Sequence, residues 1–278
     1  MIERDLQVDG GRTLHVYDTA AQERGLLPVI WHHGTPNIGT PPEPLFAAAS
    51  RLGLRWVSFD RPGYGGSDVA EGRTISSVAR DVARVADALG IDQFAVVGYS
   101  GGGSYALGCA AVLGSRVRAV LSLAGIAPYG ADGLDWFAGM VPSSVAALGT
   151  AAAGREVRAA LDASGFSYDA QFTATDLALF EGPWGWLGTV GEPALAAGPY
   201  GQIDDDVSYT LPWGCDPGAI GAPVLLLHGA ADRIIPASHG SWLAAHCLTA
   251  ELRLCEGTSH FTIVTHAESG LEWLRQQI

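Results

Sequence analysis

Short apolar runs alternate with segments of helical periodicity along most of this chain, and that alternation limits its fold more than any other feature. Apolar residues recur at helical spacing in the segments 41–52, 74–89, 101–113, 238–248 and 265–276. Strands that are separated by amphipathic helices predict a parallel sheet covered by helices on both faces, so the expected fold class is α/β. The runs that predict strands are Leu6–Val8, Thr13–Tyr17, Pro28–His32, Arg55–Phe59, Phe94–Tyr99, Val117–Leu123, Val224–His228 and Glu251–Cys255.

The regular alternation stops between about Ile126 and Cys215, and we interpret this stretch as an insertion. It is rich in small residues near 146–154 and carries many aromatic side chains. Such side chains either form a small core between inserted helices or line a pocket, and we expect most of them in the core.

The composition excludes several kinds of function. With 48% hydrophobic residues, a chain of 278 residues is long enough for one well-buried core. It has 16 basic and 29 acidic residues and a formal net charge of −13, so nucleic acids and anionic membranes are not expected as partners. All basic residues are arginines, and the lack of lysine excludes Ser–Lys dyads, Schiff-base chemistry and a P-loop lysine.

The sequence predicts a cytoplasmic protein. The segment Met1–Asp5 carries charges of both signs, unlike a secretion signal, and the apolar stretches are shorter than the roughly 20 residues that span a bilayer. The cysteines lack C-x-x-C spacing, which argues against a zinc site and a disulfide framework, although a bridge between Cys247 and Cys255 stays an alternative. The other two cysteines are Cys109 and Cys215.

A candidate nucleophile follows the strand Phe94–Tyr99. The sequence Gly98-Tyr-Ser-Gly-Gly102 has a G-x-S-x-G pattern at a predicted strand-to-helix junction. Glycine is needed at both ends because the backbones of strand and helix come so close that a Cβ would clash. Ser100 would stand at a helix N-terminus, where free N–H groups favour developing negative charge. We therefore predict Ser100 as a nucleophile, with a plain glycine-rich turn as the alternative.

A serine hydroxyl is a poor nucleophile unless a base removes its proton and a further group orients that base. His260 follows the last predicted strand and Asp232 follows the strand before it, so both are expected at the carboxyl edge of the sheet with Ser100. His228 is the alternative base, but we expect it to pack beneath the site. A surface ion pair or a helix cap is the alternative role for Asp232, and the chain order Ser, Asp, His favours catalysis.

The oxyanion of a tetrahedral intermediate needs two N–H donors. We predict the N–H of Gly101, directly after the nucleophile, as one of them. The loop after Pro28–His32 is expected to supply the other, because Gly34 lets the backbone turn towards the serine and Thr35 then donates its own N–H. An ordinary turn is the alternative role for Thr35.

With these motifs the chain resembles the α/β-hydrolase superfamily, in its serine-nucleophile branch of esterases and proline iminopeptidase-like enzymes. The resemblance implies a mostly parallel, eight-stranded sheet with helices on both faces and a helical cap inserted after the sixth strand. Residues 1–125 and 216–278 would form the core and residues 126–215 the cap. The motifs beyond the nucleophile are His33-Gly-Thr-Pro36, Asp60-Arg-Pro-Gly-Tyr-Gly-Gly-Ser67, Gly229-Ala-Ala-Asp232 and Gly257-Thr-Ser-His260, of which Asp60–Ser67 would be a structural turn.

The predicted cap holds the residues that select a substrate. Trp184 and Trp186 stand among glycine and proline residues that disfavour a regular helix, and we expect one of them to face the pocket and bind substrate. An aromatic pocket without a placed cation suits small, uncharged, partly apolar molecules. The acidic residues of this stretch are interpreted as solvated surface groups, with binding of an amine as the alternative; they include Glu181, Glu192 and Asp204–Asp206.

We therefore predict a serine hydrolase that cleaves a carboxylic ester of a small, uncharged, partly apolar substrate through an acyl-enzyme, without a metal or organic cofactor. The resemblance keeps two other bonds open, since related enzymes include proline iminopeptidases and carbon–carbon bond hydrolases. It also keeps open a ligand-binding receptor of the same fold that turns over little. The oligomeric state is not predicted.

Overall fold

The computed structural model describes residues 1–23 and 25–278, which form an eight-stranded sheet in the order β1-β2-β4-β3-β5-β6-β7-β8. β2 pairs antiparallel with both β1 and β4, and all other neighbouring strands are parallel. The predicted α/β-hydrolase fold with a mostly parallel sheet is thereby confirmed. The strands are β1 (Ile2–Gln7), β2 (Thr13–Asp18), β3 (Leu27–His32), β4 (Leu54–Phe59), β5 (Phe94–Tyr99), β6 (Val117–Leu123), β7 (Val224–Gly229) and β8 (Ala250–Cys255).

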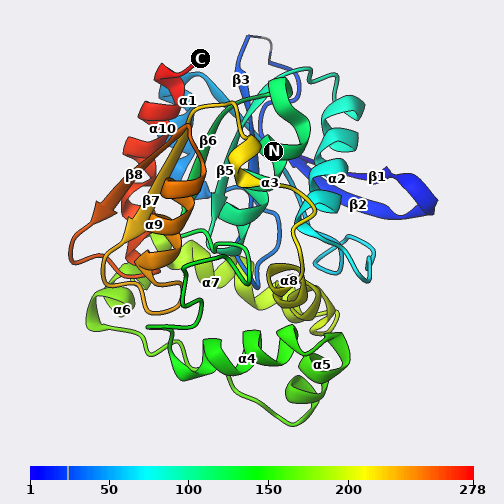
Figure 1. The fold of residues 1–278 in the computed structure, drawn as a ribbon. Helices are drawn as coiled ribbons and strands as arrows, with labels where there is room; N and C mark the ends of the chain where they lie inside the picture. The colour runs from blue at the N-terminus through cyan, green and yellow to red at the C-terminus, as the bar shows by residue number, and fades with distance from the viewer. Residues whose placement is uncertain (24) are drawn as a thin grey trace.

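Helices cover both faces of the sheet (Figure 1). α1 (Phe46–Leu52) and α10 (Ala267–Gln276) pack on one face, and α2 (Ile75–Ala88), α3 (Gly101–Leu113) and α9 (Ala237–His246) pack on the other. α2 shows why the sequence forms these elements: its apolar residues lie three or four positions apart and are buried, and the side chain of Thr74 caps its first turn.

The first strand and the last helix have other boundaries than the sequence predicts. β1 lies over Ile2–Gln7 instead of Leu6–Val8, because it is an edge strand whose charged residues hide the apolar signal. The last predicted helix divides into a short 3-10 segment, Thr262–His266, and α10.

Five α-helices lie between β6 and β7 in the chain, together beyond the carboxyl ends of the parallel strands (Figure 1). We call them the cap helices, and all of them fall within the predicted range 126–215. They are α4 (Pro142–Ala152), α5 (Arg155–Ala163), α6 (Ala174–Phe180), α7 (Trp186–Gly191) and α8 (Tyr200–Thr210).

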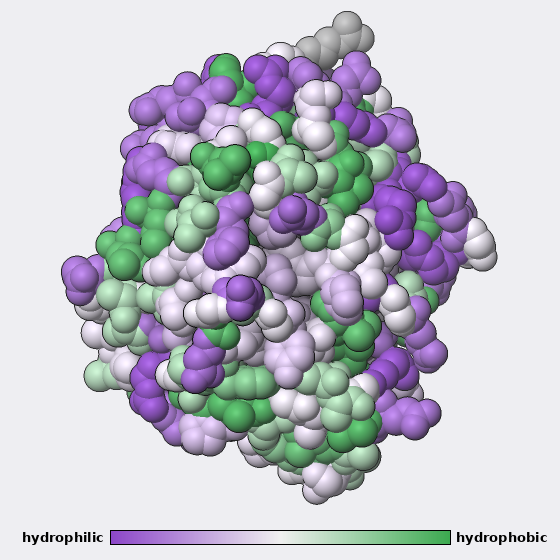
Figure 2. Space-filling model, viewed as in Figure 1, coloured by the Kyte–Doolittle hydropathy of each residue, from purple (hydrophilic) through white to green (hydrophobic). Residues whose placement is uncertain are grey.

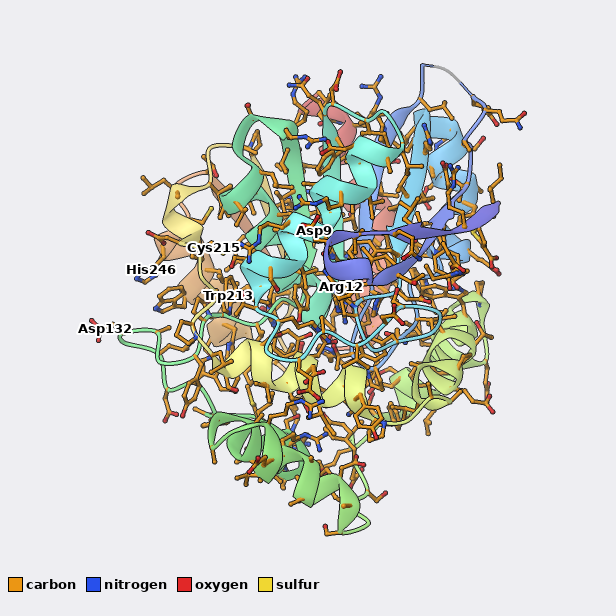
Figure 3. The ribbon with its side chains drawn as sticks, turned by 90° about the vertical axis from the view of Figure 1, so that its right-hand side faces the viewer. Asp9, Arg12, Asp132, Trp213, Cys215 and His246 are labelled. Atoms are coloured by element: carbon orange, nitrogen blue, oxygen red, sulfur yellow. The ribbon has the colours of Figure 1, made fainter. Side chains whose placement is uncertain are left out.

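The chain returns from α8 to the core along the start of α2. The Ser76 N–H donates a hydrogen bond to the carbonyl oxygen of Trp213, at 2.9 Å. Figure 3 shows Trp213 and Cys215 on this returning segment, beside the helices of that face. The end of α8 is therefore fixed to the sheet-covering helices.

In Figure 2 hydrophilic and apolar residues are mixed over the upper part of the surface, and apolar residues also gather at the lower end, over α4 and α5. Val145 on α4 and Val157 on α5 are among the exposed large apolar side chains.

Within residues 1–23 and 25–278, no helix has both the length and the apolar character that crossing a membrane requires. The structure shows all four cysteines as free thiols, so the alternative bridge between Cys247 and Cys255 is not formed.

Candidate active site

Ser100 lies in the sharp turn between β5 and α3. Its backbone has φ 56° and ψ −131°, which is uncommon for a residue with a side chain. The predicted need for glycine on either side is confirmed, since a Cβ on Gly98 would overlap the carbonyl oxygen of Gly102 and a Cβ on Gly102 would overlap the carbonyl oxygen of His32. The turn exposes the Ser100 hydroxyl at the carboxyl edge of the sheet.

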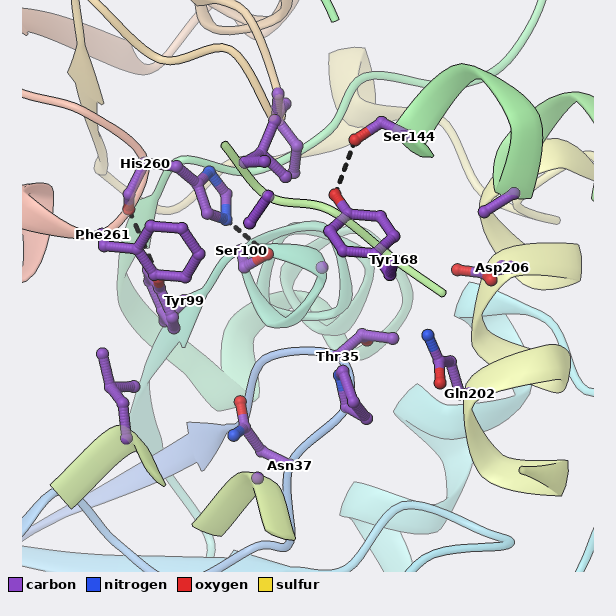
Figure 4. Close-up of a pocket in the computed structure, with 18 of the residues that line it drawn as sticks. Thr35, Asn37, Tyr99, Ser100, Ser144, Tyr168, Gln202, Asp206, His260 and Phe261 are labelled. Carbon is purple, nitrogen blue, oxygen red and sulfur yellow. Dashed lines mark hydrogen bonds between the residues drawn. The ribbon is translucent and has the colours of Figure 1, made fainter. Parts of the chain in front are cut away.

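The structure brings His260 and Asp232 to Ser100. His260 Nε2 lies 2.9 Å from Ser100 Oγ, and its Nδ1 lies 2.7 Å from Asp232 Oδ2 (Figure 4 shows the first contact). The other carboxylate oxygen, Asp232 Oδ1, accepts the N–H groups of Ile234 and Ile235, each at 2.9 Å. Both oxygens of Asp232 are thus occupied, which fixes the carboxylate and orients the imidazole so that Nε2 faces the serine.

His228 lies beneath this group and does not contact the serine. Its Nε2 is 2.7 Å from the carbonyl oxygen of Ile235 and 3.6 Å from Asp232 Oδ2. Burial lowers the pKa of His228, which keeps the imidazole neutral. Of the two candidate bases, the geometry therefore favours His260.

Thr35 and Gly101 both line the cavity that contains Ser100. Among the hydrogen bonds of the described residues, neither backbone N–H has an acceptor, so both are available to an oxyanion. A Cβ on Gly101 would overlap the hydroxyl of Tyr209, which lies 2.8 Å from Thr35 Oγ1. Gly34 is closely surrounded too, because a Cβ there would stand 2.6 Å from Asn37 Oδ1.

A buried ionic network lies behind the loop His33–Thr35. Arg61 donates to the carbonyl oxygens of His33 (2.5 Å) and Gly34 (2.9 Å), and the Thr35 hydroxyl donates to Asp205 Oδ2 at 2.6 Å. The Asp205 carboxylate also accepts from Arg61 and Arg73, each at 2.6 Å. A guanidinium on the Gly34 carbonyl polarises the Gly34–Thr35 peptide, which makes the Thr35 N–H a stronger donor.

This network carries two buried positive charges for one negative charge. Although burial opposes the charged forms, the Asp205 carboxylate raises the pKa of Arg61 and Arg73, and the two guanidiniums lower the pKa of Asp205. All three groups are therefore charged, and the excess positive charge lies close to the loop that presents Thr35. It favours negative charge on a bound oxygen.

Ser100 opens into a cavity of about 660 Å³ between the sheet edge and the cap helices (Figure 4). Its wall is formed mainly by aliphatic and aromatic side chains, and the aromatic residues contributed by the stretch 126–215 are Tyr168, Phe172, Phe180 and Tyr209. A cavity of this size accepts a small molecule.

The family model for the α/β hydrolase fold matches residues 28–267. This chain belongs to the α/β hydrolase fold family. One relative, the non-heme chloroperoxidase of Streptomyces lividans, is 25% identical over 252 residues, which cover 87% of this chain and 88% of the relative.

Two solved structures share the fold of this α/β hydrolase over nearly its whole length. The bromoperoxidase from Bacillus anthracis has a TM-score of 0.74 and 21% identity, with 99% of each chain covered. The enol-lactonase from Burkholderia xenovorans LB400 has a TM-score of 0.73 and 20% identity, also with 99% of each chain covered.

The cavity of this α/β hydrolase corrects the prediction for Trp184 and Trp186. Neither residue is among those that line the cavity. Trp186 begins the short helix α7, so the segment is more helical than predicted, and its ring packs 6.4 Å from that of Trp31 in the core on the face of α1 and α10. The glycines of the same segment, Gly185 and Gly188, face the cavity instead.

The interpretation of Asp204–Asp206 as solvated acids is also wrong. All three side chains are buried, and each pairs with arginine. The pairs are Asp204 with Arg155, Asp205 with Arg61 and Arg73, and Asp206 with Arg158. The run of three acids on a helix is the only signal in the sequence that could have indicated this network.

The turn Asp60–Ser67 has the structural role expected in an α/β hydrolase. Asp60 accepts hydrogen bonds from the N–H groups of Gly39 (2.6 Å) and Gly66 (2.9 Å), and Ser67 Oγ donates to the Asp60 carbonyl oxygen. Within the part of the chain that the structure describes, no group of three or more His, Cys, Asp or Glu side chains is arranged to hold a metal ion.

Proposed function

We propose that this α/β hydrolase cleaves carboxylic esters through an acyl-enzyme on Ser100. The observation that carries the proposal is the continuous chain of contacts from Asp232 through His260 to Ser100, at 2.7 Å and 2.9 Å, in the wall of a substrate-sized cavity. A histidine base held by a carboxylate and placed on a serine hydroxyl is an arrangement that activates serine.

In the first half of the reaction, Ser100 Oγ attacks the ester carbonyl carbon while His260 Nε2 takes the serine proton. The carbonyl oxygen becomes an oxyanion, which accepts the N–H groups of Thr35 and Gly101. The carbon–oxygen ester bond then breaks, and the leaving alcohol takes the proton from His260. In the second half, water attacks the acyl-serine, His260 removes one water proton, and the collapse of the intermediate returns a proton to Ser100 and releases the acid.

The cavity supports a small, uncharged and partly apolar substrate. Most of its lining is aliphatic or aromatic, and the acidic side chain that reaches it, Asp206, is already paired with Arg158. The enol-lactonase among the similar structures bears the name of an enzyme that opens an ester bond, which agrees with this class of substrate.

The net charge of −13 supports a small molecule, instead of nucleic acid or an anionic membrane, as the partner. The free cysteines fit a reducing compartment such as the cytoplasm.

A parallel screen distinguishes the ester proposal from the other candidates. Short p-nitrophenyl esters, proline anilides and a vinylogous diketone with a cleavable carbon–carbon bond are offered to the same preparation, and the burst amplitude is compared with the steady-state rate. We expect sustained turnover, many cycles per chain, with the esters. Faster cleavage of the anilide or the diketone would replace the ester assignment, and a single slow turnover per chain would indicate a ligand-binding receptor.

A further inference from the structure

One end of the cavity is polar, and α8 forms it. Gln202 and Asp206 lie one turn apart on this helix and both line the cavity. Figure 4 shows the amide of Gln202 and the carboxylate of Asp206 on the side away from His260 and Phe261. Outside this end, the catalytic group and the loop with Thr35 and Asn37, the wall is mostly apolar. The polar groups of this end therefore call for a physical explanation.

Asp206 has hydrogen-bonding capacity that the protein leaves unused. Asp206 is only 6% exposed, and its Oδ2 accepts a hydrogen bond from Arg158 Nε at 2.8 Å. Oδ1 accepts no hydrogen bond from the described residues, and because Asp206 lines the cavity, a ligand can donate to this oxygen. Burial accordingly raises the pKa of Asp206 to about 6, even though the Arg158 guanidinium opposes the shift.

Gln202 is unpaired as well. Its side-chain amide makes no hydrogen bond to the residues that the structure describes, so it offers both a donor and an acceptor to the cavity. The nearby polar pair, Ser144 and Tyr168, differs in this respect, because their hydroxyls bond to each other at 2.7 Å. Gln202 and Asp206 are therefore the groups at this end that await a partner.

The charges at this end favour a neutral partner. The Arg158 guanidinium balances the Asp206 carboxylate, and the half-buried carboxylate of Asp162 lies 3.9 Å from Arg158 Nη1. A ligand group that donates to Asp206 Oδ1 and accepts from the Gln202 amide satisfies both residues without adding charge. A hydroxyl group has one donor and two acceptor sites, which matches this pair.

We propose that Gln202 and Asp206 form a subsite for a hydroxyl group of the substrate, at the far end of the cavity from the ester bond. The proposal rests on the proposed ester hydrolysis and names its substrate class: esters of partly apolar molecules that carry a hydroxyl group remote from the scissile bond. An ester without the hydroxyl leaves Asp206 Oδ1 and the half-buried Gln202 amide without a hydrogen-bond partner in the complex. A site built to bind a hydroxyl discriminates strongly against the analogue that lacks it.

The test uses p-nitrophenyl alkanoates of about four to ten carbons, each with a partner that carries a terminal hydroxyl. At the chain length that reaches α8, we expect kcat/KM for the hydroxylated ester to exceed that for the plain ester by roughly 10- to 100-fold. The preference should disappear in Gln202→Leu and in the double variant Arg158→Met with Asp206→Leu, which removes the ion pair as a unit and so leaves no unpaired charge. Gln276→Leu, the same change on the exposed face of α10, is the matched control and should keep the preference.

Several outcomes would overturn the proposal. They are an absence of preference at every chain length, a preference that survives both variants, and a stronger preference for esters with a terminal ammonium group. Thermal unfolding of each variant shows whether it is folded.

If the wild-type protein hydrolyses no ester, the proposed function fails and the subsite is tested by calorimetry with N-methyl amides of the same acids. Tighter binding of the hydroxylated amide by the wild type than by Gln202→Leu would still support the subsite, and equal binding would refute it.

Discussion

Ser100 has the least favourable backbone conformation in the candidate site. Its φ of 56° belongs to the region that residues with a Cβ rarely adopt. Two hydrogen bonds hold it there: the Ser100 N–H donates to the Leu123 carbonyl oxygen, and the Ser100 carbonyl oxygen accepts from the Gly103 N–H, both at 2.8 Å. The strain places the hydroxyl in the cavity, so stability is given up for the position of one side chain.

This strain predicts that Ser100→Gly is more stable than Ser100→Ala by about 1 kcal/mol, because glycine adopts the positive φ without a clash. Urea unfolding of the two variants measures the difference. The matched control is Ser241, on the exposed side of α9, where the alanine variant should be the more stable by about 1 kcal/mol. The same sign of the difference at both positions would contradict the account.

At the scale of elements, α8 links the cap helices to the loop that presents Thr35. Asp205 on α8 bonds to the half-buried Thr35 Oγ1 and to two buried arginines of the core. The loop His33–Thr35 is thereby held from behind by Arg61 and Asp205 together. The position of the predicted oxyanion donor depends on a residue about 170 positions away in the chain.

We predict that Asp205→Asn lowers the free energy of unfolding by roughly 3–5 kcal/mol, because it leaves two buried arginines without their carboxylate. It should also lower kcat for esters more than it raises KM, since the Thr35 N–H acts on the transition state. Asp87→Asn is the control: Asp87 pairs with Arg116 at the surface, and its loss should change little. Full activity in a folded Asp205→Asn protein would show that the network does not position the loop.

The sequence could predict the site residues that follow strands, but not the contacts that depend on how the cap helices pack. Ser100, Asp232 and His260 each follow a buried strand of a parallel sheet, so their common edge follows from the pattern alone. Asp205 and Arg61 meet only through the packing of α8 on the core, and a run of three acids looks the same in a sequence whether it is solvated or buried. The side to which Trp186 points depends on the packing of α7 against Trp31, which local composition does not determine.

At the scale of the whole molecule, acidic residues outnumber basic ones, yet four arginines are used for pairs with the buried acids of α8. Asp205 and Asp206 are adjacent but have opposite shifts. The pKa of Asp205 is lowered by two guanidiniums despite its burial, whereas burial raises that of Asp206 to about 6. Stability should therefore depend on pH in a way that single variants can separate.

For Asp206 the folded pKa lies above the ordinary value of 3.8, so its contribution to stability is fully present below about pH 4 and is lost as the pH rises through about 6. The stability of the wild type relative to Asp206→Asn should fall by roughly 2–3 kcal/mol between about pH 4 and about pH 7.5. Urea unfolding of both proteins at the two pH values measures this change. A difference that is independent of pH would mean that Asp206 ionises normally in the folded protein.

The central claim is that Ser100 is the nucleophile of an ester hydrolase. Its most direct test is the steady-state hydrolysis of short p-nitrophenyl esters by the wild type and by Ser100→Ala. The account predicts sustained turnover by the wild type and a loss of roughly 10⁴-fold or more in kcat in the variant, with its fold intact. Hydrolysis that is undiminished in Ser100→Ala would contradict it.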